Sequence, residues 1–376
     1  MNKRFESIET SFLKFYFYKF FNHLTYFLYP IKLFIKYKKF NLNNVSSVCI
    51  LNQWGLGDSV QCAFIVNALL KYFPNLKISV IGNSLYKPLF LKKNIKYFSY
   101  LPPWVNKKNK YNFYGLKNYF YKSIKLRRMN FDLIISNRFD VRDIFQILFF
   151  NPKSAFLYKN SGFGFLFPNG FSKSYGDYIK NSKFDETLFF LNKLLCKNLT
   201  INNLIINNNN RTRNNINYNY AVIHAGASDK ERFLCLSCNK NFLIKCLKGY
   251  YVYIIDDKSQ CSNDLLELFS NASIKHELWR GDIENLRDLI KDCDLFVGTD
   301  SGPLNIALSL SRVCIGFYIS QGKKVRWFTN RFNKKSFATF MHHSSCIKHD
   351  RTFPNSIINQ NERLSFIKNS ITNVNR

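Results

Sequence analysis

Acidic residues are scarce in this sequence. Its 376 residues include 55 lysines and arginines but only 24 aspartates and glutamates, which gives a formal net charge of +31. Such an excess favours attraction to a polyanion: a nucleic acid, an anionic membrane surface or a phosphorylated substrate. Lysine, asparagine, isoleucine, phenylalanine and tyrosine are abundant together, and this compositional bias weakens the charge as evidence for any one partner.

The sequence also lacks an uninterrupted apolar run near its start. Residues 11–40 are densely aromatic and contain no acid, but polar side chains interrupt them at Lys14, Lys19, Asn22, His23 and Lys32. This pattern excludes both a secretory signal and a transmembrane helix. We predict that residues 1–40 form an interfacial segment, with aromatic rings at the lipid headgroups and lysines against anionic lipid. The alternative is a helical extension packed on the neighbouring domain.

A complete cysteine or histidine metal site is missing as well. The ten cysteines are scattered, mostly in apolar runs, where cysteine behaves as a small buried hydrophobe. Cys235 and Cys238 have C-x-x-C spacing, but no second pair and no suitably spaced histidine completes a zinc site. We therefore predict reduced, packed thiols, a cytoplasmic location and no metal.

The pattern that is present is an alternation of strands and helices, repeated twice. Hydrophobic residues make up 46% of the chain, enough for two cores. An Asn-rich stretch at residues 202–217 breaks all periodicity and is predicted to be a linker. We expect an α/β protein with two Rossmann-like, doubly wound domains facing a central cleft, at residues 41–201 and 218–355, followed by a C-terminal helix or tail at residues 356–376.

Three loops are predicted at the carboxyl ends of strands, where open α/β sheets bind ligands. The first, NQWGLGD, lacks the third glycine of a dinucleotide fingerprint. Its Asp58 suits a general base. With Gln61 it also matches a capping box, in which the carboxylate satisfies the first N–H groups of a helix, and taken alone the cap is the favoured interpretation.

The loop at Thr299–Pro303 follows an apolar strand and precedes a helix. A helix N-terminus offers unpaired N–H groups and partial positive charge, and the small Ser301 and Gly302 let an anion approach closely. The pattern therefore predicts a phosphate site. The alternative is that Asp300 or Ser301 caps a buried helix and nothing binds.

The third loop, HAGASDKER, joins small residues to Ser228, Lys230 and Arg232. Close backbone approach together with two cations suits a pyrophosphate and would neutralise charge that develops on a leaving nucleotide. The alternative is an ordinary polar loop.

These motifs, in the order GLGDSVQ with KYFPNLKISVIG, then HAGAS, then GTDSGPLNIALSL, resemble glycosyltransferase family 9, the lipopolysaccharide heptosyltransferases and their relatives. The resemblance covers about residues 45–320. It implies the two-domain GT-B fold, no cofactor and no metal. It also implies inverting transfer of a heptose from an ADP-linked donor to a lipid-anchored sugar core.

The resemblance also implies roles for residues. Asp58 matches the acidic residue proposed as the base on the acceptor hydroxyl, and Asp257 is a weak candidate for the ribose hydroxyls. The donor site would comprise His224, Gly226, Ala227, Ser228, Lys230, Arg232, Asp300, Ser301, Gly302 and Asn305. The chain departs from the family at Ala225, at Glu231 to Phe233 and at Asn305, which replaces a usual histidine.

The sequence therefore predicts a glycosyltransferase whose partners are a nucleotide sugar, a lipid-linked saccharide acceptor and an anionic membrane surface, with no nucleic acid. Its expected location is the cytoplasmic face of a bacterial inner membrane, as a peripheral protein. Three alternatives remain: a GT-B nucleotide-sugar epimerase, a non-catalytic binder of polyanions or anionic lipid, and a degenerate transferase that binds donor without turnover.

Overall fold

A computed structural model describes residues 20, 37, 39–90, 94–100, 102, 113–138, 140–159, 166–171, 183–200, 218–227, 232–310, 312–318 and 337–340. Most of the predicted interfacial segment, the whole Asn-rich linker and the C-terminal tail lie outside the described residues. Within that described part, no helix combines the length and apolar character needed to cross a bilayer. The chain divides into two compact units. Unit 1 comprises residues 1–199 apart from residues 182–184, and unit 2 comprises residues 200–376 together with residues 182–184.

Unit 1 contains five parallel strands in the order β3-β2-β1-β4-β5. After the central strand β1, the chain forms β2 and β3 on one side of it. It then returns to place β4 on the other side of β1, which creates a switch point between β1 and β4. The strands are β1 Ser47–Asn52, β2 Lys77–Gly82, β3 Ile95–Ser99, β4 Leu133–Ile135 and β5 Ser154–Phe156.

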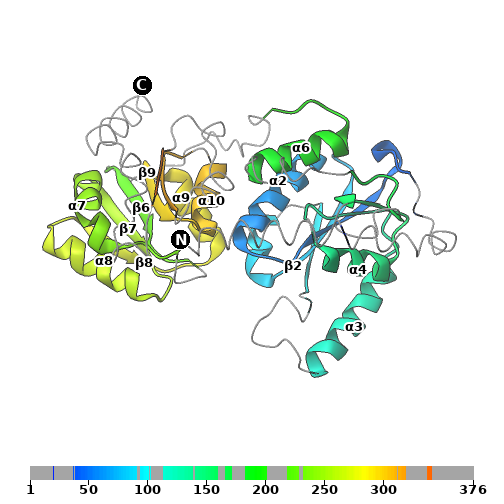
Figure 1. The fold of residues 1–376 in the computed structure, drawn as a ribbon, viewed down its shortest axis with the longest axis horizontal. Helices are drawn as coiled ribbons and strands as arrows, with labels where there is room; N and C mark the ends of the chain where they lie inside the picture. The colour runs from blue at the N-terminus through cyan, green and yellow to red at the C-terminus, as the bar shows by residue number, and fades with distance from the viewer. Residues whose placement is uncertain are drawn as a thin grey trace. The chain divides into compact units, whose positions relative to one another are not determined.

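The helices of unit 1 lie on both faces of this sheet (Figure 1). A short 3-10 helix, η2 Leu42–Asn44, precedes β1; α2 and η3 follow β1 and β2, whereas α3 and α4 follow β3 and β4. Helix α6 contacts α2 through a hydrogen bond from the Thr187 hydroxyl to the Gln61 side chain, 2.6 Å long. The remaining bounds are α2 Leu56–Tyr72, η3 Ser84–Phe90, α3 Phe113–Arg127, α4 Val141–Phe150 and α6 Lys183–Leu195.

Unit 2 contains six parallel strands in the order β11-β10-β9-β6-β7-β8. This is the same winding as in unit 1 with one further strand, and its switch point lies between β6 and β9. The strands are β6 Tyr220–His224, β7 Tyr251–Ile255, β8 His276–Trp279, β9 Leu295–Thr299, β10 Cys314–Tyr318 and β11 Phe337–Phe340.

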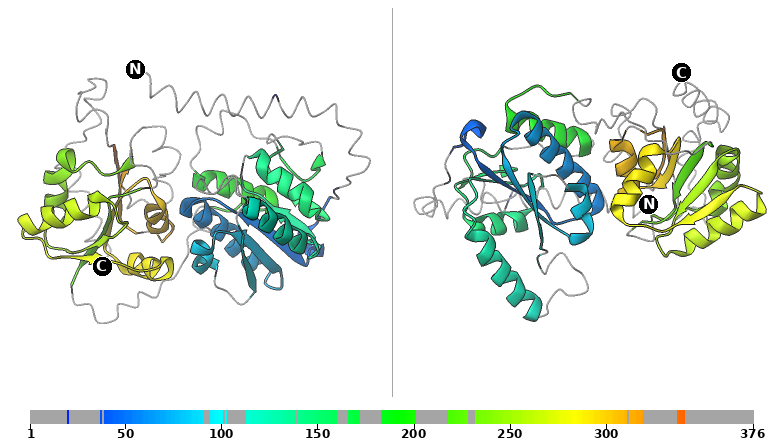
Figure 2. Two further views of the ribbon diagram at one scale, coloured as in Figure 1. Left: turned by 90° about the horizontal axis from the view of Figure 1, so that it is seen from below. Right: turned by 180° about the vertical axis from the view of Figure 1, so that it is seen from behind.

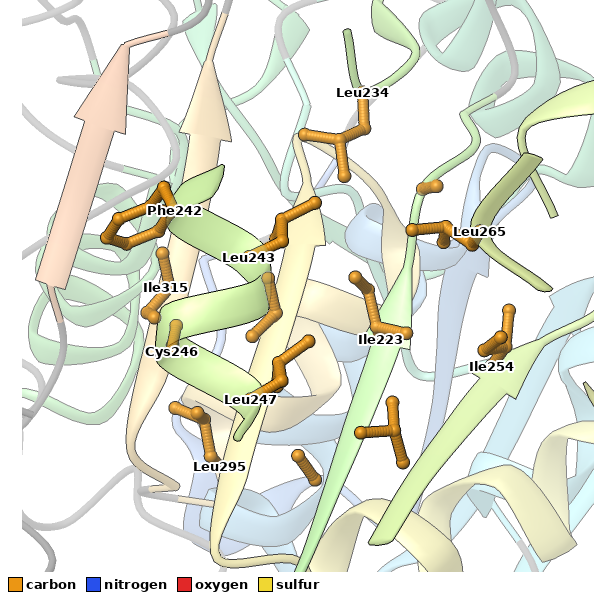
Figure 3. Packing of buried hydrophobic residues seen from close by; sticks show 14 of the residues in the cluster. Ile223, Leu234, Phe242, Leu243, Cys246, Leu247, Ile254, Leu265, Leu295 and Ile315 are labelled. Carbon is orange, nitrogen blue, oxygen red and sulfur yellow. The ribbon is translucent and has the colours of Figure 1, made fainter. Parts of the chain in front are cut away.

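Two pairs of helices cover the faces of the unit 2 sheet. Helices α7 (Leu236–Leu247) and α8 (Gln260–Asn271) lie on one face, and α9 (Ile283–Asp292) and α10 (Gly302–Ser309) on the other (Figures 1 and 2). Figure 3 shows α7 packed on the strands, with Leu243 and Leu247 among buried strand residues such as Ile223, Leu295 and Ile315. Because both faces are covered, these strands are almost continuously apolar in sequence.

The prediction of two doubly wound α/β sheets is confirmed. Sequence reasoning left residues 151–200 without an order, and the structure places β5 and α6 there. It also missed β8, because His276–Trp279 is a short, half-buried strand at a position of mixed polarity. Helix α3 has no acid in its first turn and ends in the basic residues Lys125 and Arg127.

Candidate phosphate and base sites

The switch point of unit 2 brings two of the predicted loops together. Strands β6 and β9 are neighbours, and His224 at the end of β6 lies in register with Gly298 near the end of β9. The chain leaves β6 toward α7 on one face and leaves β9 toward α10 on the other. The carboxyl ends of these two strands therefore form the edge at which open α/β sheets bind ligands.

His224 is the centre of this edge. Its Nδ1 lies 3.0 Å from the Ser301 hydroxyl at the start of α10, and its Nε2 lies 3.5 Å from Oδ2 of Asp257, which follows β7. The imidazole is buried, with 6% of its residue surface exposed. Side chains from three strand ends are thus linked in one line, from Asp257 through His224 to Ser301.

The carboxylate of Asp257 is held tightly. Its Oδ1 accepts hydrogen bonds from the Ser259 N–H at 3.0 Å and the Ser262 hydroxyl at 2.9 Å. Burial opposes ionisation, but hydrogen bonds from His224 and Ser259 outweigh it and keep the pKa of Asp257 below its usual range. A Cβ on Gly226 would lie 1.3 Å from Oδ2, so glycine is required where this carboxylate meets the loop after β6.

The N-terminus of α10 is free of a side-chain cap. Ser301 is the N-cap residue, but it makes no capping hydrogen bond, because its hydroxyl faces His224 instead. The carbonyl of Ser301 accepts from both the Asn305 N–H, at 3.3 Å, and its side-chain amide, at 2.9 Å. Within the described part of the chain, the first N–H groups of α10, at the positive end of its dipole, therefore receive no hydrogen bond from the side chain of their N-cap residue.

Arg232 brings a cation to the same edge. The loop after β6 closes where the Leu234 N–H donates to the Ala225 carbonyl at 2.8 Å. From this loop, Nη1 of Arg232 donates to the Asp300 carbonyl at 2.9 Å and lies 3.6 Å from the Asp300 carboxylate. Asp300 directly precedes Ser301, so the guanidinium is anchored beside the start of α10.

Most of the predicted donor residues are therefore gathered at one edge. His224, Gly226, Ala227, Asp300, Ser301, Gly302 and Asn305 all lie on the loops at the ends of β6 and β9 or in α10, and Arg232 and Asp257 approach from the adjoining loops. Ser228 and Lys230 lie outside the described residues. Backbone N–H groups, a hydroxyl, an imidazole and a guanidinium are the groups that bind a diphosphate.

Asp58 occupies a different position from the one a cap requires. Helix α2 begins at Leu56 with Gly55 as its N-cap, so Asp58 lies inside the first turn. The Gln61 side chain accepts a hydrogen bond from Thr187 and does not reach back to the helix start. The capping-box interpretation is therefore wrong, because the helix starts earlier than its apolar pattern suggested.

The carboxylate of Asp58 is half-buried and, among the described residues, has no hydrogen bond or ion pair. Burial is the main cause of the raised pKa values of the Cys62 thiol and the Tyr86 hydroxyl. The negative charge of Asp58 raises both pKa values further. A partly exposed carboxylate just after the carboxyl end of β1 lies at the edge where open α/β sheets bind ligands.

Sequence reasoning missed a charged cluster beside Asp58. The guanidinium carbons of Arg138 and Arg142 lie over the Trp54 ring, 3.7 and 4.4 Å from its centroid. The Arg142 guanidinium also donates two hydrogen bonds to the Asp140 carboxylate, from Nε at 2.8 Å and from Nη2 at 2.6 Å. These contacts join the loop after β1 to the loop after β4, at the switch point of unit 1.

Asp143 completes this cluster from within α4. It accepts a hydrogen bond from the Ser136 hydroxyl at 2.7 Å, and burial raises its pKa to about 6. The charges of Asp58, Arg138 and Asp143 all act on the buried Cys62 thiol, so Asp58 shares its surroundings with the cluster. The signal in the sequence was the charged run NRFDVRD directly after the largely apolar run FDLIIS.

Comparison with solved structures identifies the architecture. Heptosyltransferase WaaC of E. coli with ADP matches at a TM-score of 0.65 and 11% identity, over 86% of this chain and 99% of that one. The chain has the GT-B fold. The ADP-heptose lipopolysaccharide heptosyltransferase II of E. coli matches at a TM-score of 0.62 and 12% identity, over 88% of this chain and 100% of that one.

A family 9 glycosyltransferase from Veillonella parvula shares this GT-B fold at a TM-score of 0.59 and 10% identity, over 87% of this chain and 97% of that one. The resemblance drawn from three short motifs is thus matched by structures over most of the chain. Neither a protein-family model nor a curated protein matches the sequence. At these identities the likeness concerns the fold, and the chemistry is argued from the site.

Proposed function

We propose that this protein is an inverting, metal-independent glycosyltransferase that uses a nucleotide diphosphate sugar as donor. The observation that carries the proposal is the uncapped N-terminus of α10, where the Ser301 hydroxyl contacts His224 and Arg232 is anchored beside Asp300. These groups supply N–H donors and positive charge where a leaving diphosphate gains negative charge. With such neutralisation a metal ion is not required.

The donor we favour is an ADP-linked heptose. Two of the similar structures support this choice, one being a heptosyltransferase with ADP and the other an ADP-heptose lipopolysaccharide heptosyltransferase. Asn305 argues for keeping other sugars in the test, because a carboxamide stands where the family pattern has an imidazole. Its Oδ1 is buried and has no hydrogen-bond partner in the described part of the chain.

On the acceptor side, we assign Asp58 as the general base. It would remove the proton from an acceptor hydroxyl as that oxygen attacks the anomeric carbon, while the diphosphate departs from the opposite face. We further propose that the acceptor is a lipid-linked saccharide of the lipopolysaccharide-core type. The aromatic and cationic residues 1–40 would hold the enzyme peripherally on the cytoplasmic face of the membrane that carries it.

Thermal unfolding with ADP-, UDP-, GDP- and CMP-linked sugars tests the donor site. A ligand at a hundred times its dissociation constant stabilises the fold by about 2.7 kcal/mol, which gives a measurable rise in unfolding temperature. We expect one nucleotide class to stabilise the protein. Asp300→Asn should reduce the shift, since it removes the carboxylate charge that lies 3.6 Å from Arg232. Asp256→Asn, which alters a carboxylate bound to Arg280 and the Lys258 N–H, should retain it.

The outcome also separates the alternative functions. Stabilisation followed by sugar transfer to a deacylated lipopolysaccharide core supports the transferase. Stabilisation with epimerised free nucleotide sugar and no transfer indicates an epimerase, and stabilisation with no product indicates a degenerate transferase. The proposal fails if no nucleotide sugar stabilises the protein while anionic vesicles still bind it.

A further inference from the structure

The line from Asp257 through His224 to Ser301 carries an inference that rests on the proposed donor site. We propose that His224 is a proton-controlled switch of the diphosphate site and that Asp257 positions it. Protonation of His224 would reverse the hydrogen bond to Ser301 and leave the serine proton available to a phosphate oxygen. The donor would therefore bind with uptake of one proton from solvent.

When His224 is neutral, Ser301 donates a hydrogen bond to His224, and His224 donates one to Asp257. Its carboxylate lies 3.5 Å from Nε2, which favours the tautomer that carries hydrogen on that nitrogen. Nδ1 is then an acceptor, and the Ser301 hydroxyl 3.0 Å away donates to it. Ser301 presents only oxygen lone pairs to the start of α10, which repel a phosphate oxygen.

In the protonated state both ring nitrogens donate. Nδ1–H then donates to the Ser301 oxygen, so the serine hydrogen is released for a phosphate oxygen. A charge-assisted network replaces a neutral one, and a positive imidazolium stands beside the positive end of the α10 dipole. The imidazolium and the positive end of the dipole repel each other in the empty site, whereas both attract a bound diphosphate. Diphosphate binding and protonation of His224 therefore favour each other.

Asp257 acts through His224 in this scheme. Among the described residues, the charged groups on the loops that meet at His224 are Asp257 after β7, Arg232 before α7 and Asp300 after β9. Arg232 and Asp300 contact each other, whereas Asp257 lies at ion-pair distance from the ring. Its other oxygen is fixed by Ser259 and Ser262. We infer a positioning role for Asp257 in place of the ribose contact predicted from the sequence.

Isothermal titration calorimetry with ADP-glucose and UDP-glucose tests the coupling. Their diphosphate diesters do not titrate between about pH 6 and about pH 8, so proton uptake reports the protein. In two buffers of different ionisation enthalpy, we expect uptake that approaches one proton per ligand as the pH rises. The dissociation constant should increase with pH by up to about tenfold per unit.

Matched carboxylate variants identify the proton site. Asp257→Asn and His224→Gln should each abolish the proton uptake and flatten the pH dependence. Ser301→Ala should lose most of the affinity gained at low pH while His224 remains. Asp256→Asn should behave as the unmodified protein, because its carboxylate is held by Arg280 and the Lys258 N–H.

Two results overturn the inference in different ways. Binding with no proton uptake, or uptake that persists in Asp257→Asn and His224→Gln, would refute the switch and leave the donor site intact. If ADP-, UDP-, GDP- and CMP-linked sugars all failed to bind at any pH, the donor site would be refuted, and with it both this inference and the proposed function.

Discussion

At the scale of single residues, the structure separates two carboxylates that the sequence presents alike. Both Asp58 and Asp257 follow the end of a strand, and both are candidates for a ligand. Asp257 is bound to His224, Ser259 and Ser262, so both of its oxygens are already engaged. Asp58 is half-buried and unpaired among the described residues, so its carboxylate remains available for chemistry.

We predict that Asp58→Asn retains nucleotide-sugar binding and lowers transfer by about a hundredfold or more, the usual contribution of a general base. The substitution also removes a favourable charge from the first turn of α2, which costs only about 0.3–1 kcal/mol of stability. Transfer rates and unfolding temperatures measured together distinguish these two effects.

Asp185→Asn is the matched control for this substitution, because Asp185 occupies the first turn of α6 in the same unit. It should lose a similar amount of stability and retain full transfer. Equal transfer rates in the Asp58 variant and the unmodified protein would show that Asp58 is not the general base and only stabilises the helix.

At the scale of elements, α9 and α10 show how two neighbouring helices use their N-termini differently. Helix α9 is capped in the ordinary way, because Asp282 accepts a hydrogen bond from the Asn285 N–H at 2.9 Å. Helix α10 begins with a serine whose hydroxyl is directed to His224. A helix that leaves its N-terminus without a side-chain cap gives up stability at a place where a ligand can supply the missing acceptor.

We predict that Asp282→Ala lowers the stability of unit 2 by about 1 kcal/mol through the loss of this cap. Nucleotide-sugar affinity should be unchanged, because Asp282 is not one of the side chains gathered at the ends of β6, β7 and β9, and its carboxylate already accepts from the Asn285 N–H. Chemical unfolding and calorimetric titration measure the two quantities.

Asp288→Ala is the control within the same helix. Its side chain is 56% exposed and, within the residues that the structure describes, pairs only with its neighbour Arg287, a contact worth little in water. The element-scale account fails if both variants have the same stability, or if Asp282→Ala weakens the binding of the nucleotide sugar.

At the scale of the whole molecule, the net charge of +31 acts together with the basic, aromatic start of the chain. Residues 11–40 contain lysines without any acid, so this segment would be attracted to anionic headgroups at about 1 kcal/mol per lysine near the surface. Such attraction is screened by salt, whereas the hydrophobic contribution of the aromatic rings is not.

We predict that deleting residues 1–40 lowers binding to vesicles containing phosphatidylserine by at least tenfold, while donor binding is retained. Sedimentation with vesicles at low and high salt measures this effect, and vesicles of phosphatidylcholine alone control for charge. Deleting residues 356–376 instead should leave vesicle binding nearly unchanged. A shortened protein that still sediments with anionic vesicles would contradict the interfacial assignment.

The sequence alone determined the architecture, because its signals are local. Strands such as Leu295–Thr299 are covered on both faces and are therefore apolar throughout, and each is followed by a turn and a helix with clear apolar periodicity. These repeated signals predict two doubly wound sheets. The same signals place the loops at Asp58, His224 and Ser301 at the ends of strands, and the three motifs indicate the fold family.

Tertiary structure decided which of these loops meet and what each side chain does there. The line from Asp257 to Ser301 depends on three strands that are separated along the chain and brought into register by the sheet. The start of α2 and the cluster around Trp54 depend on contacts from α4 and α6. Local propensity carries no information about such distant partners, so only the packed sheet shows which carboxylate is held by other described residues and which is not.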